Sequence, residues 1–164
     1  MMPFSLDDRL KFAFRWLLQL DRPVPPRSDA QIAAEQARHY RWNFTFNLLD
    51  GASFWFGLSF ISDSTIVPLF ISKLTDSPLP LGIAAVISQG SWFLPQLFTA
   101  KDVERLARKK PVVVNLGFFV ERVPTWLSVI AAMLAGRTPT LALLLFLFAF
   151  AWRGLGGGVV ATAW

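Results

Sequence analysis

The sequence predicts an all-α membrane protein: four membrane-spanning helices of one bundle, preceded by a cytoplasmic amphipathic helix. Hydrophobic residues make up 54% of the 164 residues, and charged residues only 16%, whereas soluble domains carry about a quarter. The charges are also clustered between long apolar runs, so they could not cover a surface that faces water. The lipid bilayer is therefore the expected surrounding for most of the chain.

Residues 1–42 are expected to form a cytoplasmic tail. Apolar and charged residues fall on opposite helical faces between residues 5 and 20, which is typical of an amphipathic helix. Such a helix would lie on the membrane surface or pack against the rest of the protein. Asp21–Ser28 contains three prolines and predicts a linker. Ser28 and Gln31 form a capping-box pattern for a second helix that runs into the first span.

Four stretches are long and apolar enough to cross a bilayer, which requires about 20 residues. We expect the spans at residues 43–72, 79–100, 111–136 and 140–164. The connections between them are short, so consecutive helices should be antiparallel neighbours. The last stretch reaches Trp164 without a polar residue to close it, and we therefore expect this chain to be the truncated N-terminal portion of a larger protein.

The distribution of basic residues predicts how the spans are oriented. Seven Lys or Arg precede residue 43 and five lie within 101–110, against one in each of the other two connections. Basic residues accumulate on the cytoplasmic side, so the N-terminus and the 101–110 connection are expected there, in a protein of the cell membrane. Because the basic residues lie in two blocks beside apolar runs, nucleic acid is not an expected partner.

Ionisable residues inside spans are candidates for function because burying them in lipid is costly. Glu121 and Arg153 are expected at similar depths on neighbouring helices, where they could form an ion pair, and Arg122 would add a surplus positive charge. Such a pair would either fix helix packing or carry a proton or substrate.

A polar stripe is expected along the first span. It consists of Asn43, Asn47, Asp50, Gly57, Ser64 and Thr65. A stripe of this kind faces a cavity or another helix, and the acidic Asp50 favours a cavity. We therefore add Asn47 and Asp50 to Glu121, Arg122 and Arg153 as candidates for substrate binding or ion coupling.

Other residue patterns bound the chemistry. Glycines in the run Gly154–Gly158 would let a neighbouring backbone come close, and Pro124 would interrupt the third span. The chain has no cysteine and one histidine, so neither a metal site nor a cofactor is expected. The absence of a visible nucleophile–base pair argues against an enzyme.

The 101–110 connection resembles a known signature. Its residues are Ala100, Glu104, Arg105, Ala107, Arg108 and Lys109. Their spacing and charge order are similar to G-x-x-x-D-R-x-G-R-R, found between the second and third helices of the major facilitator superfamily. Alanines replace both glycines, and Glu104 replaces the aspartate. The resemblance implies that this segment helps to close the cytoplasmic side of a transporter.

A second resemblance lies in the fourth span. Arg153-x-x-Gly156-Gly157 is similar to the R-x-x-Q-G pattern of proton-coupled members of the same superfamily, with Gly156 in place of glutamine. Membership implies a fold of about twelve helices in two halves, with a small-molecule substrate bound between them and exposed alternately to the two sides. The remaining helices would then be missing from this chain.

Two other functions are open at this point. A complete four-span protein could act as a small oligomeric exporter coupled to protons. The chain could instead be a membrane scaffold that does not transport and whose amphipathic tail recruits a partner.

Overall fold

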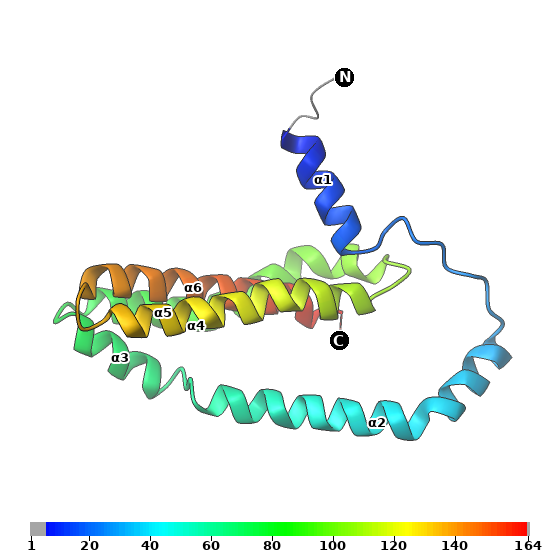
Figure 1. Ribbon diagram of the computed structural model, residues 1–164, viewed down its shortest axis with the longest axis horizontal. Helices are drawn as coiled ribbons and strands as arrows, with labels where there is room; N and C mark the ends of the chain where they lie inside the picture. Colours follow the sequence, from blue (N-terminus) through cyan, green and yellow to red (C-terminus); the bar gives the residue numbers. More distant parts are fainter. Residues whose placement is uncertain (1–5, 164) are drawn as a thin grey trace. The chain divides into compact units, whose positions relative to one another are not determined.

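The computed structural model describes residues 6–163, and within that range every regular element is helical, which confirms the all-α prediction. The elements are α1 Leu6–Leu17, α2 Asp29–Ser59, α3 Ile66–Leu74, α4 Leu79–Glu104, η1 Val112–Leu116, η2 Phe118–Arg122, α5 Val123–Leu134 and α6 Pro139–Ala161 (Figure 1). The chain forms two compact units. One extends to Arg22 and resumes at Phe70, and the other is Pro23–Leu69.

Three helices are long and apolar enough to cross a membrane: α4, the continuous helix Val112–Leu134 and α6. They coincide closely with the predicted spans 79–100, 111–136 and 140–164. This agreement supports association with a membrane. The helix α4 runs four residues further than expected because Lys101–Glu104 contains no glycine or proline to end it.

The predicted first span, 43–72, is wrong as a single helix. α2 ends at Ser59 and α3 begins at Ile66. The intervening residues form turns, and the hydroxyls of Ser62 and Ser64 bond to each other there at 3.1 Å. Pro68 then lies in the first turn of α3, where its missing N–H costs no helical hydrogen bond.

The start of α2 confirms the predicted capping box. The Gln31 N–H donates to Ser28 Oγ at 3.3 Å, and the Ser28 N–H donates to Gln31 Oε1 at 3.0 Å. α2 continues without a break past residue 42, so the second helix runs into the apolar stretch as expected. Its polar residues Asn43, Asn47 and Asp50 lower the hydropathy of its second half, and α2 is not among the three helices above.

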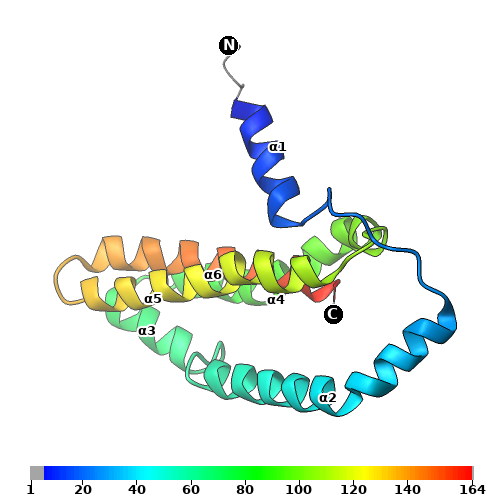
Figure 2. The same ribbon diagram turned by 45° about the vertical axis from the view of Figure 1, so that its right-hand side comes forward.

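The helix α6 is the core of the larger unit. It contacts α4 along one side, and it contacts η2 and α5 along another. In both views α6 runs beside α4 and α5 (Figures 1 and 2). Its buried residues are Ala142, Phe146, Ala149, Phe150, Gly156, Gly157, Gly158 and Val160. Small residues therefore dominate the contact surface of the central helix, as they do where membrane helices pack closely.

The glycine run confirms the predicted close approach of backbones. A Cβ on Gly158 would lie 2.5 Å from the Trp92 carbonyl oxygen and 3.0 Å from that of Ser91, both in α4. A Cβ on Gly154 would overlap the Ser91 side chain, and one on Gly156 would overlap Val120. α6 can therefore touch α4 and η2 at these heights only because it carries glycine there.

Candidate functional site

The segment Val112–Arg122 is wound as two π-helical turns, η1 and η2, joined at Gly117. Pro124 explains part of this winding, because it has no N–H to donate to the carbonyl of Val120. One residue earlier, the Val123 N–H bonds to the carbonyl of Phe118, five residues back, which is the spacing of a π-helix. Such wide turns occur frequently at functional sites, and here they carry two charged residues.

Those two residues, Glu121 and Arg122, form an ion pair. Arg122 Nη1 donates to Glu121 Oε2 at 2.6 Å. The Glu121 side chain is 17% exposed and that of Arg122 is half exposed. A Cβ on Gly117 would lie 3.8 Å from Arg122 Nη1 and 3.8 Å from Val160 Cγ1. The pair therefore lies over Gly117, at the contact between η2 and α6.

Arg153 lies on the same helix–helix contact. It is half-buried on α6, and its guanidinium carbon is 5.6 Å from the centre of the Phe150 ring, within range of a cation–π interaction. Gly156, three residues later, packs against Val120, the neighbour of Glu121 in sequence. α6 and η2, the elements that carry Arg153 and Glu121, therefore meet close to both residues, while the direct pairing of the two stays a prediction.

Asn47 and Asp50 lie on α2, in the smaller unit, and both side chains are exposed. Their participation in a network with Glu121 stays a prediction. The polar stripe is shorter than expected, since Ser64 and Thr65 follow the end of α2 and are not helical. The turn at Ser62–Thr65 removes them from the register of Asn47 and Asp50.

The proposed cytoplasmic gating segment is more helical than expected. Ala100 is half-buried and Glu104 is exposed, and both belong to α4, while Arg105 caps its end. The irregular part is thus confined to Arg105–Lys109, not 101–110 as predicted. The carbonyl of Lys109 accepts from the N–H groups of Val112 and Val113 at 2.9 and 3.3 Å, and this starts the next helix.

The charges of the gating segment are largely open. Glu104, Arg105 and Lys109 are exposed and form no ion pair with any residue of 6–163, and Arg108 is half-buried. The side chains of Glu104, Arg105 and Lys109 could therefore contact a partner surface without first breaking an internal salt bridge.

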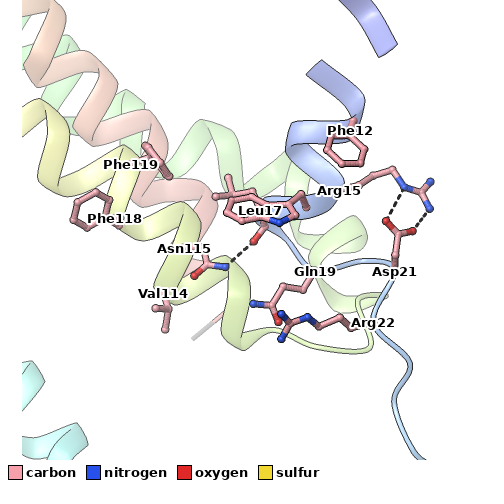
Figure 3. A pocket seen from close by; sticks show the side chains of 11 residues that line it. Phe12, Arg15, Leu17, Gln19, Asp21, Arg22, Val114, Asn115, Phe118 and Phe119 are labelled. Carbon is pink, nitrogen blue, oxygen red and sulfur yellow. Dashed lines mark hydrogen bonds and ion pairs between the residues drawn. The ribbon is translucent and has the colours of Figure 1, made fainter. Parts of the chain in front are cut away.

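One contact of the larger unit was not predicted. Asn115 Nδ2 donates to the carbonyl of Leu17 at 2.7 Å and so satisfies a free carbonyl at the end of α1 (Figure 3). Leu18 is buried beside it, and the chain turns at Gln19, whose φ is +52°. α1 therefore packs against the protein at its C-terminal end, although most of its side chains are exposed. The one signal in the sequence was a lone asparagine within an apolar run.

The arrangement places an acid–base pair inside a candidate membrane span, at a contact between two helices. Comparisons with known families, with curated proteins and with solved structures find no match.

Chemically, the carboxylate of Glu121 can accept a proton, which would release Arg122 to bind an anion or another carboxylate. Such an exchange couples a change of protonation to a change of helix contact.

Proposed function

We propose that the chain is the N-terminal part of a secondary transporter of the major facilitator type, which moves a small solute by alternating access. The observation that carries this proposal is the Glu121–Arg122 pair, with a mostly buried carboxylate in a helix apolar enough to span a membrane. Charged groups are retained in such positions when they bind ions, protons or substrates.

The coupling step would use the contact between η2 and α6. When ionised, Glu121 holds Arg122 at 2.6 Å. Protonation would remove the negative charge and free Arg122. Its guanidinium lies beside Gly117, where the π-helical segment meets Val160 of α6. A proton bound on one side of the membrane would thereby favour a different packing of the π-helical segment on α6, and Arg153 would complete the network.

The membrane arrangement in this proposal has four spans, with the N-terminus in the cytoplasm of the cell. The fourth span would come from the apolar part of α2 together with α3. The contact between Asn115 and Leu17 supports the orientation, because it holds the basic tail near the start of Val112–Leu134, just after the basic 101–110 segment. Two basic segments at one end of the unit agree with a cytoplasmic location for both.

The gating segment would act through its charged side chains. Ala100 allows close packing near the end of α4, while Glu104, Arg105, Arg108 and Lys109 would contact the half of the transporter that this chain lacks. That contact would close the cytoplasmic side when the substrate site opens outward.

Membrane topology can be tested directly because the chain contains no cysteine. Single cysteines at Ala107 and Gly136 would be labelled in intact cells with a maleimide that does not cross membranes. We expect Ala107→Cys to react only after permeabilisation and Gly136→Cys to react before it. The reverse pattern would contradict the cytoplasmic N-terminus.

The transport proposal itself is tested with the whole gene product. Reading the source DNA beyond codon 164 should reveal a continuous frame with about eight further spans. That protein, in proteoliposomes loaded with a pH-sensitive dye, should change the internal pH when one class of small solute is added outside. A stop codon after Trp164, or no response to any solute class, would overturn the proposal.

A further inference from the structure

A cavity of about 570 Å³ opens where the end of α1 meets the π-helical segment (Figure 3). It is lined by Phe12, Arg15, Trp16, Leu17, Gln19, Asp21, Arg22, Val114, Asn115, Phe118 and Phe119. We call this the α1 pocket. None of these side chains takes part in the proposed proton exchange between Glu121 and Arg122, although four of them belong to the π-helical segment.

The lining of the α1 pocket divides chemically into two parts. Polar side chains come from Arg15 of α1, from the turn after α1 and from Asn115, and aromatic side chains come from Phe12, Trp16, Phe118 and Phe119. Trp16 is 72% exposed, and Phe118 is also exposed. A pocket with a polar part and an apolar part fits an amphiphile better than a fully polar solute.

The charge of the pocket is positive. Arg15 is neutralised by Asp21, to which it donates two hydrogen bonds, one of them from Nε at 3.4 Å. The Arg22 side chain forms no ion pair within residues 6–163, while its backbone N–H holds the turn by donating to the Gln19 carbonyl at 3.2 Å. One arginine is therefore available to an anionic group.

We propose that the α1 pocket binds an anionic phospholipid of the surrounding membrane. The phosphate would bind Arg22 and the amide groups of Gln19 and Asn115, and the first part of an acyl chain would lie along Phe118 and Phe119. Aromatic side chains beside an arginine are typical of the level of lipid headgroups, and basic pockets near the cytoplasmic face bind such headgroups. The volume is enough for a headgroup and the beginning of one chain, not for a whole lipid.

Lipid binding would fasten the amphipathic helix to the bundle. Phe12 and Trp16 come from α1, whereas Phe118 and Phe119 come from η2, so one lipid would touch both elements. The proposal does not depend on transport. Its readout is lipid retention, so it can fail or succeed independently of the solute experiments.

The test uses the whole chain of 164 residues, purified in detergent and analysed by native mass spectrometry with added lipid. We expect it to retain one phosphatidylglycerol more tightly than phosphatidylcholine. Arg22→Gln should lower this retention about fivefold, in line with roughly 1 kcal/mol for one basic residue near lipid. The matched control is Arg9→Gln, an exposed arginine of α1 that does not line the pocket, and it should bind like the wild type.

Three results would overturn the proposal. Equal retention of the two lipids would show that the anionic headgroup is not recognised, and equal losses in Arg22→Gln and Arg9→Gln would show general charge attraction. Displacement of the lipid by millimolar inorganic phosphate would identify a site for a free anion. Phe118→Ala provides a second variant: it should weaken lipid retention without changing helicity measured by circular dichroism.

Discussion

Two arginine–glutamate pairs in this protein have the same length and different surroundings. Arg27 and Glu35 approach to 2.6 Å at the start of α2, and Arg122 and Glu121 approach to 2.6 Å in η2. Glu35 is 53% exposed, whereas Glu121 is 17% exposed. An exposed ion pair contributes little to stability or function, since water solvates each charge about as well as the partner charge does. Only the second pair has a charge whose state must affect the packing around it.

The helices that carry the two pairs differ in the same way. α2 has no buried residue among its 31 residues, while α6, against which Glu121 lies, is buried along much of its length. The sequence places charges in both regions, but packing makes one of them sensitive to change. The first two predictions below alter one region and use the other as their control.

The largest effect is expected from filling the closest helix contact. Gly158→Leu would push the side chain into the Ser91 and Trp92 carbonyls of α4, and we expect it to lower the free energy of unfolding by roughly 3 kcal/mol. Gly57→Leu on α2 meets nothing within 4 Å and should not lower that free energy, and the higher helix propensity of leucine would raise it by at most about 1 kcal/mol. Thermal unfolding in detergent, followed by tryptophan fluorescence, compares the two. Similar losses in both variants would contradict the difference between the regions.

A smaller effect is expected at the junction of α1. Asn115→Leu removes the hydrogen bond to the Leu17 carbonyl, at a cost of about 1 kcal/mol. Amide hydrogen exchange in the last turn of α1 should then become about fivefold faster. Asn43→Leu, on the exposed surface of α2, is the control and should leave exchange in α1 as it was. Unchanged exchange in Asn115→Leu would mean that this contact does not hold α1.

The smallest effect is a pH dependence of the turn after α1. The hydrogen bond from Arg15 holds the pKa of Asp21 below its ordinary value of 3.8, so the ionised carboxylate favours the folded turn. This contribution is present above that value and is lost as the pH falls through the lowered pKa. Because both groups are exposed, the expected change is a modest loss in acid of the protection of Leu18–Leu20 against exchange, measured relative to an unstructured peptide at the same pH. Asp21→Asn should abolish the pH dependence of this protection, and a dependence that persists would assign it to another group.

The regular parts of the fold were predictable because they depend on composition over long windows. The apolar runs of α4, Val112–Leu134 and α6 need lipid or protein around them whatever their exact contacts are. The capping box at Ser28 is local chemistry between residues three apart, and the sequence carries it in full.

Other features were not predictable because they depend on competition between local and distant interactions. The average hydropathy of residues 43–72 favours one continuous helix. The hydroxyl groups before Ile66 and the proline at Pro68 favour a break, and the structure has the break between α2 and α3. The bond between Asn115 and Leu17 joins residues 98 positions apart, so no local pattern reveals the partner. The two π-helical turns surround Glu121, and its ion pair with the neighbouring Arg122 was not predicted.

The most direct test of the proposed transport role compares the two glutamates in the whole gene product. Solute-driven pH change in dye-loaded proteoliposomes would be measured for the wild type, Glu121→Gln and Glu35→Gln. We predict that Glu121→Gln reduces the rate about a hundredfold, as expected for the loss of a proton-transferring group, and that Glu35→Gln leaves it unchanged. Equal rates in all three proteins, or equal losses in both variants, would contradict a role for the Glu121–Arg122 pair.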